Sequence, residues 1–271
     1  MVVMLFAAGC YAPDPTAGAP CAAGGTCPEG LVCSPASQTC ERTAVDARVD
    51  AIRDSAVTAR DAPDAPTDAA TTATLIQAAR NYASPSTSLA VELANAPAAG
   101  HVLVLIAGNP HAPLATVTGG GATWQLAAIS PVYANVEIWF GVTDGSSSTV
   151  TATDPGSTAP MSMLLTEWSG LATANILDGA VAIDGTTSPA SAGTITTAHA
   201  RDLLIFAISD AVPNTFGAPA PGTWSALPVL DNAVIQAAWY DVVDTAGSFA
   251  PQVTETAHTW DAALVGLKIA P

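Results

Sequence analysis

Residues 101–170 and 201–270 resemble each other at a constant offset of 100 positions. The offset matches three aromatic pairs in one register: Trp124 with Trp224, Trp139 with Trp239, and Phe140 with Tyr240. Tryptophan is a rare residue, so two tryptophan matches at a single offset indicate an internal duplication. A chain of this kind is expected to fold as two similar halves with the same pattern of elements.

From residue 74 onward the apolar runs are short and are separated by Gly, Pro, Asn, Asp and Ser. Examples are 102–106, 136–140 and 203–206, with Thr-rich alternation at 148–153. No segment has the 3.6-residue period of a convincing amphipathic helix. The pattern predicts an all-β fold over residues 73–271, a two-sheet, jelly-roll-like β-sandwich in which the two halves share one core.

Three short motifs in this region resemble a β-sandwich module that is common in bacterial exported and surface proteins. They are Gly-x-Thr-Trp at 121–124, Glu-Trp-Ser-Gly-Leu at 167–171 and Leu-Val-Gly-Leu-Lys at 264–268. The resemblance covers residues 73–271 and implies the same sandwich fold. It implies no activity, because none is established for the module.

Four of the five cysteines lie close together, at Cys21, Cys27, Cys33 and Cys40. They lack the C-x2-C pair of a structural zinc site, and no histidine is near. In an exported chain they predict two disulfides in a module over residues 10–40, with three pairings open. The Cys-Pro-x-Gly-x-x-Cys segment at 27–33 resembles segments that follow lipoprotein signals in myxobacterial exported proteins, which implies the same compartment.

The fifth cysteine, Cys10, closes an apolar segment that ends in Ala-Gly-Cys. Residues 1–9 resemble the end of a bacterial lipoprotein signal, which implies a lipid on the Cys10 thiol and a membrane as partner, at the outer membrane or cell surface. The run is short and lacks the usual basic residue, so we expect the natural start to lie further upstream. The alternative is an ordinary free thiol at the N-terminus.

Residues 41–72 repeat Asp-Ala and contain Pro63 and Pro66 but few apolar side chains. Low hydrophobicity with mixed charge and proline predicts a disordered tether between the module and the β-domain. A flexible tether of this length spans roughly 30 Å root-mean-square.

The chain carries a net charge of −16 with seven Lys and Arg in total, and three basic residues follow position 72: Arg80, Arg201 and Lys268. Nucleic acid is excluded as a partner, because its binding needs clustered cations.

The four histidines, His101, His111, His199 and His258, form no paired zinc motif, and His199 and His258 are interpreted as solvated. No nucleophile elbow or phosphate loop is present either. The sequence therefore predicts no catalytic residue, no metal and no cofactor; Asp144-Gly145 and Asp154-Pro155-Gly156 are interpreted as turns, with a calcium loop as the alternative.

Period-2 alternation places Glu137 and Trp139 on one strand face, and Trp239 and Asp241 on the matching face of the second half. We expect this face to point outward and to bind a ligand, with the rings stacking on a sugar. Glu167 is expected to point inward, with Arg201 or backbone donors as its partners.

The leading functional hypothesis is a non-enzymatic surface protein that binds a glycan or a protein partner. A purely structural envelope protein is the first alternative. A carbohydrate-active hydrolase is the second, and it requires two carboxylates about 5–10 Å apart in a cleft.

Overall fold

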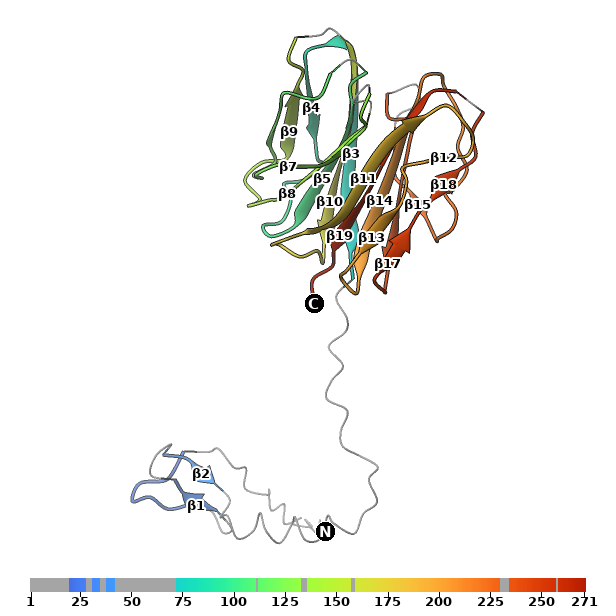
Figure 1. The fold of residues 1–271 in the computed structure, drawn as a ribbon. Coiled ribbons are helices and arrows are strands. Elements are labelled where there is room, and N and C mark those ends of the chain that lie inside the picture. Colours follow the sequence, from blue (N-terminus) through green and yellow to red (C-terminus); the bar gives the residue numbers. More distant parts are fainter. Residues whose placement is uncertain are drawn as a thin grey trace, which may run out of the picture. The chain divides into compact units, whose positions relative to one another are not determined.

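The computed structural model divides into two units, residues 1–68 and 69–271, each described by itself. The structure describes residues 20–27, 31–34, 38–41, 72–110, 112–132, 136–156, 159–229, 234–256 and 258–271 (Figure 1). Every regular element among them is a β-strand, which confirms the predicted all-β class. No helix of the described residues is long and apolar enough to cross a membrane. Cys10 and nearly all of the predicted tether lie outside the described residues.

The N-terminal unit contains a small cross-linked module. Strand β1 (Val32–Cys33) pairs antiparallel with β2 (Cys40–Glu41). Two disulfides are present, Cys21–Cys33 and Cys27–Cys40. They confirm the two predicted bridges and select one of the three pairings. Val32 is 54% exposed, so the cross-links contribute more to holding this segment together than an apolar core does.

The first half of the large unit contains a five-stranded sheet with the order β3-β10-β5-β8-β7 and a three-stranded sheet with the order β4-β9-β6. All of their pairings are antiparallel. The strands are β3 (Thr74–Ser86), β4 (Ser88–Glu92), β5 (Val102–Gly108), β6 (Thr116–Gly119), β7 (Gln125–Ile129), β8 (Glu137–Val142), β9 (Thr149–Thr153) and β10 (Ala159–Ser169).

The second half has a five-stranded antiparallel sheet with the order β11-β19-β14-β16-β15, and two small sheets, β12-β18 and β13-β17. The strands are β11 (Leu177–Gly185), β12 (Ala190–Ser191), β13 (Ile195–Thr197), β14 (Asp202–Asp210), β15 (Ser225–Ala226), β16 (Ala237–Val243), β17 (Gly247–Phe249), β18 (Gln252–Val253) and β19 (Trp260–Lys268).

The two large sheets have corresponding strand orders. Strands β5 and β14 are both third in their sheets and begin at residues 102 and 202, and the fourth strands, β8 and β16, begin at 137 and 237. Segments that match at the offset of 100 therefore occupy matching places in the two sheets. A common origin of the halves by duplication stays a prediction.

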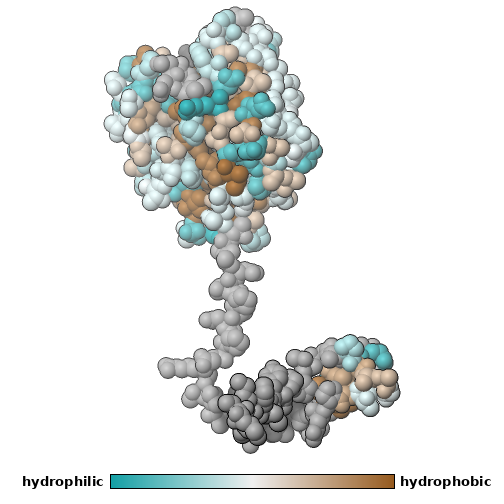
Figure 2. Space-filling view, turned by 180° about the vertical axis from the view of Figure 1, so that it is seen from behind, coloured by the Kyte–Doolittle hydropathy of each residue, from teal (hydrophilic) through white to brown (hydrophobic). Residues whose placement is uncertain are grey.

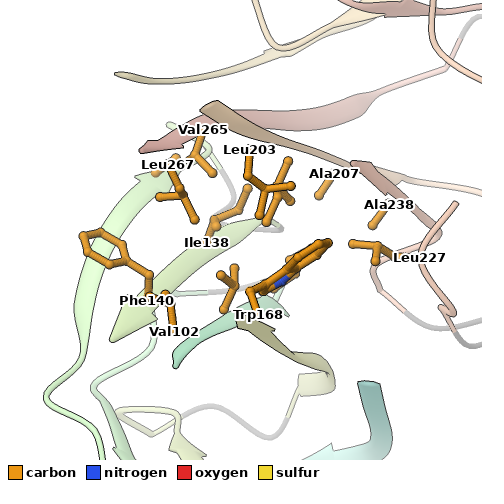
Figure 3. Close-up of a cluster of buried hydrophobic side chains, with 14 of the residues drawn as sticks. Val102, Ile138, Phe140, Trp168, Leu203, Ala207, Leu227, Ala238, Val265 and Leu267 are labelled. Carbon is orange, nitrogen blue, oxygen red and sulfur yellow. The ribbon is translucent and has the colours of Figure 1, made fainter. Parts of the chain in front are cut away.

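The two large sheets face each other across a central apolar core. Figure 3 shows Val102, Ile138, Phe140 and Trp168 of the first sheet opposite a set from the second half: Leu203, Ala207, Leu227, Ala238, Val265 and Leu267. Trp168 is fully buried, and its ring meets Tyr240 edge-on at a centroid distance of 5.0 Å. This sheet-on-sheet core is the predicted β-sandwich.

Each half also has an outer core of its own, on the other face of its large sheet. In the first half Leu103, Leu105 and Ala107 pack with residues of the small sheet such as Val91 and Val150. In the second half an equivalent outer cluster includes Phe206, Trp239 and Trp260. Strands β5 and β14 are apolar on both faces, so each face has to be covered. The β-domain therefore has three cores, the central one between the two large sheets and one outer core in each half.

Candidate functional site

Glu137 and Trp139, expected on an outward face, lie instead against the outer core of the first half. Glu137 is 1% exposed, and its carboxylate accepts hydrogen bonds from the Leu114 backbone N–H (2.7 Å) and the Trp139 indole N–H (2.8 Å). Trp139 is half-buried and packs against this core. Burial raises the pKa of Glu137, and the two hydrogen bonds offset only part of that rise.

Trp239 and Asp241 are buried in the same way in the second half. The Trp239 ring is 5% exposed and stacks on Phe206, with centroids 5.7 Å apart, while Phe216 meets it edge-on. Asp241 accepts hydrogen bonds from the Thr223 backbone N–H (3.0 Å) and hydroxyl (2.9 Å). The prediction that this face points outward is wrong, because the small sheets cover it.

The sequence carried a signal for these covering sheets. Residues 102–106 and 203–206 are apolar at every position, so both faces of these strands had to be buried. Trp139 lies directly opposite Leu105 on the neighbouring strand, and Trp239 lies opposite Phe206. Each tryptophan therefore shares its face with a fully buried side chain.

Glu167 is buried, as expected, at the end of β10. Its carboxylate accepts hydrogen bonds from Gln77 Nε2 (2.6 Å) and the Ala98 backbone N–H (2.9 Å), and lies 2.6 Å from His101 Nδ1. Burial raises its pKa, but these hydrogen bonds and the charge of His101 lower it by more, so the net shift is downward. Of the two kinds of partner expected, a backbone donor is present, the Ala98 N–H, whereas Arg201 donates to the carbonyl of Ala270.

The two candidate calcium segments are turns whose own carboxylates cap them. Asp144 Oδ1 accepts the Ser146 backbone N–H at 2.8 Å, and Asp154 Oδ1 accepts that of Gly156 at 2.9 Å. Asp154 also accepts a hydrogen bond from Asn109 Nδ2 at 2.6 Å. Both carboxylates therefore have local structural partners.

A pocket of about 420 Å³ lies where β14 ends and β19 begins. The antiparallel register pairs Ser209 with Asp261 and Asp210 with Trp260, which brings two aspartates to the same end of the sheet. The lining residues are Pro110, Ser209, Asp210, Ala211, Val234, Thr259 and Asp261. Asp210 and Asp261 are 7% and 1% exposed, so the wall of this pocket carries buried acidic groups.

Two further ionisable residues, Glu255 and His258, lie beside Asp210 in the loop between β18 and β19. One ligand atom from each of the three lies within 4.8 Å of the others, an arrangement able to hold a metal ion. Glu255 is 7% exposed, and neither of its oxygens completes a hydrogen bond with a described residue. Burial and the Asp210 carboxylate raise the pKa of Glu255, while the charge of His258 and its backbone N–H lower it by less.

The sequence did not identify this group. His258 was interpreted as solvated, whereas it is half-buried beside two acidic residues. A Glu-x-x-His spacing at 255–258 was the only local signal, and it is weak outside a helix. Asp210 comes from a distant strand, so only the fold brings the three together.

Among the described residues, the surface has no group of exposed aromatic rings of the kind expected for sugar binding. Apolar and polar residues are mixed on the face shown in Figure 2. Within the described part of the β-domain, the exposed large apolar side chains include a single aromatic one, Tyr82; the others are Ile76, Leu126, Val132, Ile183 and Val212. The acidic pocket is therefore the best-defined candidate site.

No protein-family model, curated protein or solved structure matches this chain. Its function has to be argued from its own residues.

Proposed function

We propose that the chain is an exported, lipid-anchored protein of the cell envelope, whose β-domain makes non-enzymatic contacts with a glycan or a protein partner. The pair of disulfides in the N-terminal module carries this proposal. Disulfides form and persist in oxidising compartments, and small modules that depend on them are typical of exported proteins.

Cysteine pairing also supports the anchor. Four of the five cysteines pair with one another, which leaves Cys10 as the odd one. A thioether to a lipid accounts for the odd thiol and for the apolar residues that precede it. Residues 41–72, rich in Asp, Ala and Pro, would then hold the β-domain away from the membrane.

The acidic pocket is the part of the β-domain that best supports contact with a partner. Four of its lining residues, Ser209, Asp210, Thr259 and Asp261, carry hydroxyl or carboxylate groups. These groups suit the hydroxyls of a sugar or the donors of a peptide. The expected aromatic face supports such contact less well, because Trp239 is buried and Trp139 is half-buried.

Membrane fractionation of the producing cells tests the anchor. The wild-type chain should be found with the membranes, and Cys10→Ser should move it to the soluble exported fraction. The double variant Cys27→Ser/Cys40→Ser is the matched control, because it loses two cysteines and keeps Cys10. A Cys10→Ser chain that stays with the membranes would contradict the proposal.

Glycoside hydrolysis is a second candidate, favoured by one observation: Asp210 and Asp261 line the same pocket. Hydrolases of this class use two carboxylates, which in this pocket come from opposite faces of the sheet. Release of reducing sugar from envelope polysaccharide by the wild type, lost in Asp261→Asn, would establish this second function in place of the first.

A further inference from the structure

We propose that Asp210, Glu255 and His258 bind one divalent transition-metal ion, of the Zn²⁺ type, in the wall of the pocket between the ends of β14 and β19. This inference goes beyond the proposed function and does not depend on it. The ligand atoms of the three residues all lie within 4.8 Å of one another. Ligand atoms about 2.1 Å from a tetrahedral zinc ion are about 3.4 Å apart. Side-chain rotations that move the ligand atoms by roughly an ångström would therefore complete the site.

Glu255 supplies an observation that is independent of the clustering. The residue is 7% exposed, and both carboxylate oxygens are buried without a well-formed hydrogen bond to a described residue, although the His258 backbone N–H is near enough to lower the pKa of Glu255. An isolated buried carboxylate destabilises the fold unless it is neutralised or paired. A bound cation between Glu255 and Asp210 removes that cost and the repulsion between the two groups.

Among the described residues of the β-domain, no Arg or Lys side chain forms an ion pair with Glu255. The ion pairs found within the described segments are His101–Glu167 and Lys268–Asp178, both away from the pocket. Arg201 and Lys268 lie at the other end of β14 and β19 from Asp210, since Lys268 is in register with Asp202. Arg80 belongs to β3 and donates to the Val229 carbonyl.

His258 makes the outer hydrogen bond that is typical of a metal-bound histidine. Its Nδ1 lies 2.8 Å from the Thr256 carbonyl, which can only accept, so Nδ1 carries the proton and the lone pair is on Nε2. Metal-bound histidines typically donate their other ring N–H to a carbonyl or carboxylate in this way.

Asp210 is also held in place by its neighbours. The Val212 backbone N–H donates to Oδ1 at 3.1 Å, and the Asn214 side-chain amide donates to Oδ2 at 3.0 Å. Each oxygen keeps a lone pair that can bind a metal. Such outer hydrogen bonds orient a ligating carboxylate before the ion arrives.

The donor set selects the class of ion. Calcium takes six to eight oxygen ligands, and magnesium requires a near-octahedral set of oxygens and waters. Two carboxylates and an imidazole suit zinc and related transition metals, with a fourth position open to water. Asp210 belongs to both the ligand group and the pocket lining, so the ion would lie next to the pocket.

Isothermal titration of the full-length chain tests the site. The protein is stripped with a chelator and titrated with Zn²⁺ or Ca²⁺ without reductant, because the module cysteines also lie close together and reduced thiols would bind zinc. We expect one Zn²⁺ per chain, with Ca²⁺ binding at least about tenfold more weakly. The absence of saturable Zn²⁺ binding, or tighter binding of Ca²⁺, would overturn the assignment.

Two variants locate the ion. Glu255→Gln and His258→Gln should each weaken Zn²⁺ binding by about tenfold or more. The matched control is His199→Gln, which removes another half-buried histidine whose Nδ1 lies 2.8 Å from a backbone carbonyl. If Glu255→Gln does not fold, His258→Gln decides, because its side chain is partly exposed. Equal affinities of His258→Gln and His199→Gln would refute the site.

Discussion

Replacing Glu167 tests whether its carboxylate joins the end of β10 to its neighbours. Glu167→Ala removes the acceptor for Gln77, for the Ala98 backbone N–H and for His101. An unsatisfied buried donor costs about 1–3 kcal/mol. The three donors are themselves half-buried or exposed and can turn to water in part, so we expect a combined loss of about 3 kcal/mol in the free energy of unfolding.

Glu167→Gln should cost less, about 1–1.5 kcal/mol, because it keeps the volume and one acceptor oxygen but loses the charge-assisted hydrogen bonds. In a domain of this size 1 kcal/mol shifts the Tm by about 2–4 °C. Glu167→Ala should therefore lower the Tm by roughly 6–12 °C and Glu167→Gln by roughly 2–6 °C.

The difference between wild type and Glu167→Gln should also depend on pH. The pKa of Glu167 is lower in the folded chain than its ordinary value of 4.5, so in acid the unfolded chain binds more protons. The stability that ionised Glu167 contributes is fully present above the ordinary pKa of 4.5. It is lost as the pH falls through the lower pKa that Glu167 has in the folded chain. We expect the two stabilities to converge in this acid range.

Thermal and urea unfolding, followed by tryptophan fluorescence, measure these differences. Glu92→Ala is the matched control, because Glu92 is exposed and its loss should change the stability by less than about 0.5 kcal/mol. A Glu167→Ala chain as stable as Glu92→Ala would refute the role assigned to the buried carboxylate.

Two further predictions concern packing and cross-linking. Trp239→Ala should cost about 3–5 kcal/mol in urea unfolding, because its ring stacks on Phe206 in an outer core, and half-buried Trp139→Ala should cost less; a negligible loss from Trp239→Ala would contradict this packing. The unreduced chain should be four hydrogens lighter than the reduced one, two for each disulfide, and partial reduction with alkylation should label Cys21 together with Cys33, and Cys27 together with Cys40; labelling of Cys21 together with Cys27 in one step would contradict the pairing.

The all-β class and the two disulfides could be predicted because their signals are local. Short apolar runs between turn residues leave no length for a helix, and four cysteines within 20 residues without a zinc pattern are expected to pair with one another. The choice of partner for Cys21 could not be predicted, because it depends on how β1 and β2 approach each other.

Which residues share a strand face was easier to predict than whether that face meets solvent or another sheet. Alternation correctly grouped Glu137 with Trp139, but it could not distinguish solvent from a second layer of sheet. The polar residues of this face are satisfied internally, Glu137 by Leu114 and Trp139, and Asp241 by Thr223. A carboxylate beside an aromatic ring on one face is therefore compatible with a core wherever neighbouring N–H and O–H groups reach it.

The acidic group at the pocket shows why a site made from several segments does not appear in the sequence. Asp210 ends β14, whereas Glu255 and His258 belong to the loop before β19, and they meet only because β14 and β19 pair along their whole length. At the matching positions of the first half, 110 and 155 are both proline and 158 is threonine. The group is therefore specific to the second half, although both halves share the strand order that places it. If the repeated fold is a scaffold, a chemical role is expected where the halves differ, and here the difference is a cluster of acidic and imidazole ligands.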